Sequence, residues 1–151
     1  MKKYFPIFVD LEKKDILVVG GGKIAYRKIK TLLNYGAKIE VITPKIVEEK
    51  INILFKENKI RVTLREFKES DIENRFLIIG ATNNKELNRK IYELGDLKNI
   101  LVNNITTKKD LNTKFSAIYR GENFQIAIST DEGNPKKALE IKNQIEKSLK
   151  N

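Results

Sequence analysis

The 151-residue sequence contains neither cysteine nor histidine. The lack of cysteine excludes disulfides, thiolate metal sites and cysteine nucleophiles, and it makes a cytoplasmic location the expected one. The lack of histidine removes the commonest general base and the commonest transition-metal ligand. Any acid–base chemistry must therefore use Asp, Glu, Lys or Tyr, and no metal site is predicted.

Long apolar stretches are also missing. No run approaches the roughly 20 residues that a membrane-spanning helix needs, so no membrane partner is predicted. Residues 1–6 include two lysines but no apolar core, which argues against a signal peptide. With 40% hydrophobic and 33% charged residues, the chain is expected to form one folded domain with a small addition.

The charge is strongly one-sided, at a formal +10. One interpretation is an anionic partner, either nucleic acid or a ligand rich in carboxylates or phosphates. The other is a lysine-rich surface with no specific partner. The lysines are scattered and lack interleaved aromatic residues of the kind that stack on bases, so no nucleic-acid partner is predicted.

The most informative stretch is an apolar run, Ile16–Val19, that leads directly into three glycines. A helical pattern follows, so the sequence predicts a strand, a tight turn and a helix N-terminus. The spacing Gly20-x-Gly22-x-x-Ala25 is a form of the dinucleotide-binding fingerprint. A plain turn between strand and helix, without a ligand, remains the alternative.

Strand and helix patterns alternate along most of the chain, which predicts an α/β fold with a Rossmann-like, doubly wound parallel sheet. Gly36 and Gly95 are expected to end the first and third helices, and Ile51, Leu54 and Phe55 are expected to face inward from the second. An extended arm, residues 4–11, is expected to turn Phe5, Ile7, Val9 and Leu11 toward the protein. The predicted strands are 15–19, 38–42, 60–64, 76–79 and 100–103, and the predicted helices are 23–35, 47–58 and 85–94.

The pattern changes near residue 113. Residues 114–119 and 124–129 predict an antiparallel hairpin, which Gly133-Asn134-Pro135 separates from a helix over 136–149. A two-stranded hairpin is not stable alone, so it is expected to lie on the first domain or to pair with a second copy. We therefore expect a nucleotide-binding domain over 1–112 and a dimerisation segment over 113–151, giving a homodimer.

Ligands of a doubly wound sheet bind beyond the carboxyl ends of its strands. Besides the glycine turn, this edge is expected to hold Thr43-Pro44, the small residues Gly80–Asn83, and Val102–Thr107. An acid often follows the second strand, where it binds the ribose 2′-hydroxyl, but here Glu40 lies within the strand. Local chemistry therefore leaves NAD and NADP both open.

Six ordered blocks carry a more specific signal: Phe5–Leu11, Leu17–Lys28, Gly36–Pro44, Leu77–Asn88, Phe115–Ile118 and Gln125–Thr130. Together they resemble the precorrin-2 dehydrogenase/sirohydrochlorin ferrochelatase family, the N-terminal module of siroheme synthase. The resemblance implies a homodimer that uses NAD to oxidise precorrin-2, a tetrapyrrole, to sirohydrochlorin in siroheme biosynthesis. In some members it also implies ferrochelatase activity. By position it assigns cofactor contacts to Gly20, Gly22, Lys23, Ile24, Thr43, Pro44, Ala81, Thr82 and Asn103.

The chain departs from the family pattern at three points. The position of the family's catalytic aspartate is Thr106, and the nearest acid is Asp110, so no catalytic residue is assigned. Asn134-Pro135 stands where the family often has Ser-Pro. Family members usually continue into a further helical segment, and a truncated C-terminal helical domain is therefore expected here. The alternative function is therefore a non-catalytic dimer of the same family that binds NAD or senses a tetrapyrrole.

Overall fold

The computed structural model describes residues 4–107, 109–130 and 134–149. It forms two compact units: the larger lies within residues 6–113, and the smaller contains Tyr4, Phe5 and the described residues from Lys114 onward. Among the described residues, no helix is both long enough and apolar enough to cross a membrane. Gly133, where a break in the chain was predicted, lies outside the described residues.

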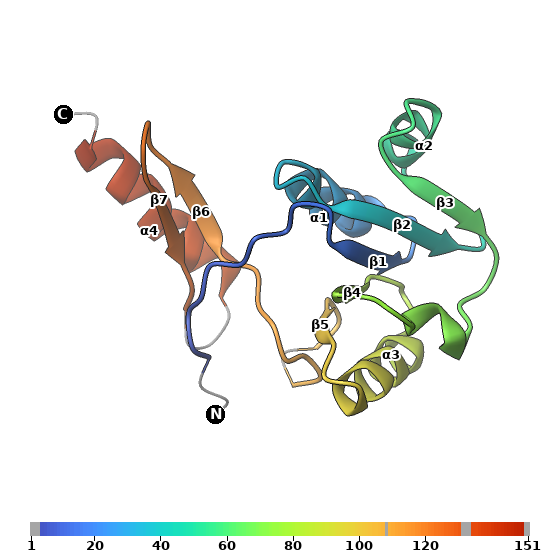
Figure 1. Ribbon diagram of the computed structural model, residues 1–151. Helices are drawn as coiled ribbons and strands as arrows, with labels where there is room; N and C mark the ends of the chain where they lie inside the picture. Colours follow the sequence, from blue (N-terminus) through green and yellow to red (C-terminus); the bar gives the residue numbers. More distant parts are fainter. Residues whose placement is uncertain (1–3, 108, 131–133, 150–151) are drawn as a thin grey trace. The chain divides into compact units, whose positions relative to one another are not determined.

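The larger unit is built on a five-stranded parallel sheet with the order β3-β2-β1-β4-β5, labelled in Figure 1. This order reverses direction between β1 and β4, which is where a doubly wound sheet binds its ligand. Both the fold class and the number of strands were predicted. The strands are β1 (Asp15–Val19), β2 (Lys38–Thr43), β3 (Arg61–Leu64), β4 (Leu77–Gly80) and β5 (Leu101–Asn104).

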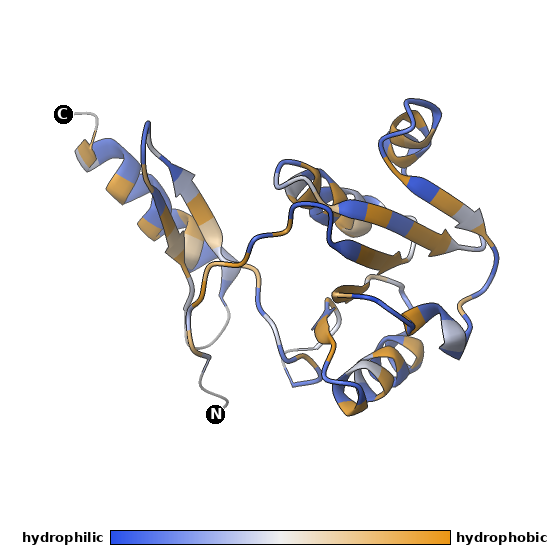
Figure 2. Ribbon diagram, viewed as in Figure 1, coloured by the Kyte–Doolittle hydropathy of each residue, from blue (hydrophilic) through white to orange (hydrophobic). Residues whose placement is uncertain are grey.

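The unit contains three helices: α1 (Lys23–Leu33), α2 (Glu49–Lys56) and α3 (Lys85–Leu97). Of these, α1 packs against β1 and β2, and α3 packs against β4 and β5. In Figure 2, β1 is coloured mostly as hydrophobic, whereas hydrophobic and hydrophilic residues alternate around α3. This agrees with a strand that is covered on both faces and a helix with one buried face. On one side of the sheet, a cluster of buried residues packs against Ile72 and against Ile91 of α3. The sheet residues of this cluster are Leu17, Val19, Ile42, Ile78 and Val102.

Three expectations about local packing were wrong. The third helix does not end near Gly95 but continues to Leu97, and a Cβ at Gly95 would lie 2.5 Å from Cγ2 of Val102. Gly95 therefore allows α3 to approach β5 closely. Phe55 is 44% exposed, although it lies one turn after Ile51, which is the buried residue of α2. Three of the four arm residues expected to face inward are exposed instead: Phe5, Ile7 and Val9 are 85%, 66% and 39% exposed, and only Leu11 is partly buried.

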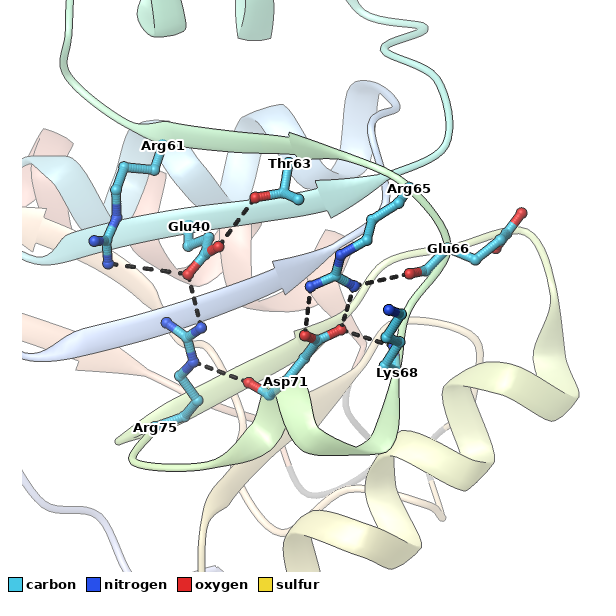
Figure 3. Close-up of polar contacts among 8 residues, drawn as sticks. All are labelled: Glu40, Arg61, Thr63, Arg65, Glu66, Lys68, Asp71 and Arg75. Carbon is cyan, nitrogen blue, oxygen red and sulfur yellow. Dashed lines mark hydrogen bonds and ion pairs between the residues drawn. The ribbon is translucent and has the colours of Figure 1, made fainter.

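The connection from β3 to β4 contains only a short 3-10 turn, Glu69–Ile72 (η1), and charged side chains fix it to the sheet (Figure 3). Asp71 accepts two hydrogen bonds from the guanidinium of Arg65, at 2.8 and 2.7 Å. Glu40 in β2 forms a 2.7 Å ion pair with Arg75 and accepts a hydrogen bond from Thr63. These contacts explain how a carboxylate is tolerated in the middle of a strand.

The smaller unit contains β6 (Ala117–Arg120), β7 (Gln125–Ile128) and α4 (Pro135–Leu149). The two strands are antiparallel, and the backbone N–H of Gly121 donates to the carbonyl of Phe124 across the turn. The predicted hairpin and helix are therefore confirmed, with strands shorter than expected. The helix buries Ala138 but leaves Leu139 and Leu149 about half exposed, at 51% and 52%.

Candidate functional site

The glycine turn after β1 is held against the turn after β4. Gly20 has φ +123°, a conformation that side chains with a Cβ rarely adopt, and a Cβ there would overlap the carbonyl of Ala81. The amide of Ala81 in turn donates to the carbonyl of Val19 at 2.8 Å. Two of the segments predicted to form the site therefore lie together at the carboxyl edge of the sheet.

The segment after β2 is pinned to the same turn through Gly21. The carbonyl of Gly21 accepts hydrogen bonds from the amides of Val47 and Glu48, both at 2.9 Å. A Cβ at Gly21 would lie 2.7 Å from the carbonyl oxygen of Lys45 and 3.0 Å from Oγ1 of Thr43. The middle glycine, which the fingerprint leaves unspecified, is therefore needed here for packing.

The N-terminus of α1 suits a phosphate group. Its N-cap residue is Gly22, which supplies no capping side chain, and the first turn contains no acidic residue. The first N–H groups of a helix lack partners within the helix, and its dipole attracts negative charge. A Cβ at Gly22 would meet no atom within 4 Å, so the space above the turn is open. Lys23 and Ile24, also predicted contacts, are both exposed here.

The predicted adenosine contacts differ from each other in exposure. Thr43 is only 4% exposed, and its hydroxyl donates to the carbonyl of Lys45 at 2.8 Å. Pro44 and Lys45 are exposed beside it. The Glu40 carboxylate lies three residues earlier and is engaged by Arg75. The end of β2 itself therefore presents a cation, Lys45, and no free acid.

On the far side of the switch point, the turn after β4 is ordered by a buried amide. Ala81 is 7% exposed, and Thr82 beside it is partly exposed. Asn88 of α3 is fully buried; its Oδ1 accepts from the hydroxyl of Thr82 at 2.8 Å and its Nδ2 donates to the carbonyl of Thr82 at 2.9 Å. Asn84 caps α3 by accepting from the amide of Leu87 at 3.0 Å.

The segment after β5 holds its amide side chains inward. Asn103, predicted to line the nicotinamide side, is 6% exposed and donates to the carbonyl of Thr113 at 2.9 Å. Asn104 is 2% exposed, and its Oδ1 accepts from both the amide and the hydroxyl of Thr106, at 2.9 and 2.7 Å. Asp110 has no hydrogen-bond or ion-pair partner among the described residues. Within the same described part of the chain, no three His, Cys, Asp or Glu side chains gather as a metal site.

Sequence reasoning did not assign roles to Asn88 or Lys45, and it placed Asn104 at the ligand-binding edge only as part of Val102–Thr107. Asn88 was noted only as part of a block that resembles a family. A signal was nevertheless present, since an asparagine at a position of α3 that faces the core must find partners for its amide. Lys45 could have been found as the first charged residue after a strand that ends without an acid.

The chain matches a sequence family described as "Putative NAD(P)-binding" over residues 7–117. Siroheme synthase of Neisseria meningitidis is 35% identical over 146 residues, which are 97% of this chain and 30% of that protein. A probable multifunctional siroheme biosynthesis protein HemA of Ruminiclostridium josui is 39% identical over 117 residues, which are 76% of this chain and 22% of that protein. The chain therefore spans less than a third of the length of these two relatives.

A solved structure extends the similarity to the fold. The protein described as SirC, precorrin-2 dehydrogenase, has a TM-score of 0.78 to this chain and 31% sequence identity. The match covers 96% of this chain and 71% of that one, so it includes both compact units. The chain belongs to the NAD(P)-binding family that includes siroheme synthase and the precorrin-2 dehydrogenase SirC.

Proposed function

We propose that this protein is an NAD-dependent dehydrogenase that oxidises precorrin-2 to sirohydrochlorin in siroheme biosynthesis. The observation that carries the proposal is the match to the precorrin-2 dehydrogenase SirC over 96% of the chain at 31% identity. The open, uncapped N-terminus of α1 beside three glycines supports the cofactor part of it.

Each segment of the site has a role in this proposal. The N-terminus of α1 binds the diphosphate of the cofactor through backbone N–H groups, with Gly22 allowing close approach. Thr43, Pro44 and Lys45 flank the adenosine, while Ala81 and Thr82 flank the nicotinamide. Bound NAD⁺ supplies the chemistry by accepting a hydride. The protein contributes position and electrostatics, because the described part of the site offers no imidazole or thiolate for proton transfer.

The charge of the chain supports a substrate rich in carboxylates. A net charge of +10 raises the local concentration of anionic ligands and speeds their association. We also propose that the chain acts as a homodimer through the hairpin and α4, whose Phe124, Leu139 and Leu149 are 46%, 51% and 52% exposed. Iron insertion has less support, because Thr106 cannot bind iron as a carboxylate does.

The test is a direct assay with purified protein, precorrin-2 and NAD⁺, followed by the absorbance of the reduced nicotinamide. We expect reduced cofactor and sirohydrochlorin to form in equal amounts. A parallel reaction with NADP⁺ tests the choice of NAD. Tight binding of NAD⁺ without any reduction, at all substrate concentrations, would contradict the proposal.

One observation favours a second function, that of a non-catalytic dimer that binds NAD or senses a tetrapyrrole. Thr106 stands at the position of the family's catalytic aspartate, and its hydroxyl proton is donated to Asn104 at 2.7 Å. A hydroxyl engaged in this way is neither a base nor a free donor. The sensor function predicts that a tetrapyrrole changes the affinity for NAD⁺ while no reduced cofactor forms.

A further inference from the structure

Asn88 is a polar side chain in an apolar environment. It lies on the same face of α3 as Ile91 and Gly95, and all three are buried. Burying an amide without hydrogen bonds costs about 1–3 kcal/mol, so such a residue needs a complete set of partners. The structure supplies these partners, because both N–H donors and the carbonyl oxygen of the Asn88 side chain face hydrogen-bond partners.

The partners of Asn88 lie on two different segments. Its Oδ1 accepts from the amide and the hydroxyl of Thr82, at 3.2 and 2.8 Å, and its Nδ2 donates to the carbonyl of Thr82 at 2.9 Å. The second proton of Nδ2 points to Oγ1 of Thr106, at 3.5 Å. One side chain of α3 therefore joins the turn after β4 to the segment after β5.

The contacts of the Thr106 hydroxyl determine whether it can donate or accept a further hydrogen bond. Its proton is donated to Oδ1 of Asn104, and its oxygen faces Nδ2 of Asn88. A hydroxyl with its proton already used can only accept a further hydrogen bond. Asn88 and Asn104 together thus fix Thr106, which is partly exposed, as an acceptor.

Close packing keeps Asn88 under the turn. Gly80, the last residue of β4, would place a Cβ 3.4 Å from Oδ1 and 3.5 Å from Cα of Asn88. These are ordinary van der Waals distances, so Asn88 packs directly against the end of β4 with room for no more than a methyl group between them. Gly80 pairs in register with Asn104 across the sheet, so the strand ends and Asn88 form one unit.

We propose that Asn88 is a positioning residue for the nicotinamide half of the cofactor site, because it fixes Thr82 on one side and Thr106 on the other without being exposed itself. The proposal rests on the proposed function in that it assumes a nicotinamide dinucleotide at this edge of the sheet. It assigns no part to Asn88 in binding the adenosine or the diphosphate, which lie on the other side of the switch point.

The test compares two ligands that share the adenosine diphosphate portion. ADP-ribose lacks the nicotinamide, so calorimetric titration with ADP-ribose and with NAD⁺ separates the two halves of the site. Asn88→Asp keeps the acceptor for Thr82 but replaces the donor Nδ2 by an oxygen. We expect its Kd for NAD⁺ to rise about five- to tenfold, the cost of one or two lost hydrogen bonds, with the Kd for ADP-ribose unchanged.

Asn84→Asp is the matched control. It makes the same chemical change four residues earlier, at an exposed N-cap where Asp and Asn serve equally well. Both Kd values should stay at those of the unmodified protein. If Asn88→Asp weakens the two ligands by the same factor, or weakens neither, the positioning role is wrong.

A second variant covers the case in which Asn88→Asp does not fold. Thr106→Val removes the oriented hydroxyl at a partly exposed position and should reproduce the selective loss for NAD⁺. An unchanged ratio of the two Kd values in Thr106→Val overturns the role of that contact. Where both variants fold, combining them should add less than the sum of their separate effects.

Failure of the positioning role of Asn88 can be distinguished from failure of the proposed dehydrogenase function. An unmodified chain that binds NAD⁺ but forms no reduced cofactor with precorrin-2 contradicts the dehydrogenase, while the ratio of Kd values still tests Asn88. If the dehydrogenase is active, Asn88→Asp should lower kcat more than it raises KM for precorrin-2. A change in KM alone would argue against positioning of the hydride acceptor.

Discussion

Asp71 accepts two hydrogen bonds from the Arg65 guanidinium, one at each carboxylate oxygen, and it does so from a nearly buried position. The backbone amide of Lys68 donates a third bond to Asp71 at 2.7 Å. This arrangement closes the β3–β4 connection onto the sheet, as Figure 3 shows. Charge-assisted, bidentate pairs of this kind are stronger than ordinary hydrogen bonds.

The first prediction concerns acid stability. The hydrogen bonds from Arg65 hold the pKa of Asp71 below its usual value, despite the opposing effect of burial. A carboxyl whose pKa is lower in the folded state stabilises the fold above about pH 4, and this contribution is lost as pH falls through the lowered pKa. Asp71→Asn should cost roughly 1–3 kcal/mol at neutral pH in urea unfolding, with the difference shrinking toward pH 2.

Glu69→Gln serves as the control for this change. Glu69 forms an ion pair with Lys90 in which both side chains are more than half exposed, at 61% and 54%. Exposed pairs contribute little, so the variant should stay within about 0.5 kcal/mol of the unmodified protein. Equal losses in the two variants would show that overall charge, and not the buried contact, sets acid stability.

The second prediction concerns the glycine turn. Gly22 has ordinary backbone angles and open space around a Cβ, so a side chain is tolerated there. Gly22→Asp supplies a good N-cap to α1 and places a carboxylate where the diphosphate is proposed to bind. The helix should gain a few tenths of a kcal/mol, while NAD⁺ affinity falls about 100-fold through charge repulsion.

Gly22→Asn separates charge from size, because it caps a helix as well as Asp does but is neutral. It should lose markedly less affinity in the same titration. Equal affinities of the Asp and Asn variants for NAD⁺ would argue against a diphosphate at this helix.

Gly20→Ala should lower stability. Residue 20 has a positive φ, and a Cβ there would overlap the carbonyl of Ala81, so the free energy of unfolding should fall by about 1–3 kcal/mol.

The features that sequence could predict are those that local chemistry determines. Ile16–Val19 is apolar throughout, and only glycine allows the turn at Gly20, so strand, turn and helix follow from consecutive residues. Asn88 and Thr106 lie 18 positions apart, and Glu40 and Arg75 lie 35 apart, so no local period contains these contacts. Phe55 was misplaced because a helical pattern shows which residues share a face and not how much of that face a neighbouring element covers.

The third prediction concerns alkaline pH. Burial, with a smaller contribution from the charge of Arg27, lowers the pKa of Lys28 from 10.5 to about 8. Between these values the unfolded chain holds a proton that the folded chain lacks, so this group makes stability rise with pH across that window. Below about pH 8 both states are protonated and the full penalty of burying the charge applies.

Lys28→Met should therefore raise the free energy of unfolding at pH 7 by roughly 1–3 kcal/mol, with the gain declining as pH approaches 10. Lys30→Met, an exposed position on the same helix, is the control and should keep the pH profile of the unmodified protein. The measurement is urea unfolding from pH 7 to pH 10. A destabilised Lys28→Met at pH 7 would show that contacts of the ammonium group outweigh the cost of burying it.

The fourth prediction separates the two functions proposed for this chain. Nδ2 of Asn88 faces position 106, whereas Asn104 presents Oδ1 there and is held in that orientation by the backbone amide of Thr106. Thr106→Asp would therefore place a carboxylate next to the amide donor of Asn88, which favours its charged form. If the unmodified chain is a decayed catalyst, the variant should gain dehydrogenase activity or iron insertion by about tenfold or more.

Thr106→Asn is the control, because its side chain has the same shape as that of Asp but no charge, and it should gain no activity. If the unmodified chain already reduces NAD⁺ and Thr106→Asp adds nothing, the sensor function is wrong and the reaction needs no carboxylate at this position.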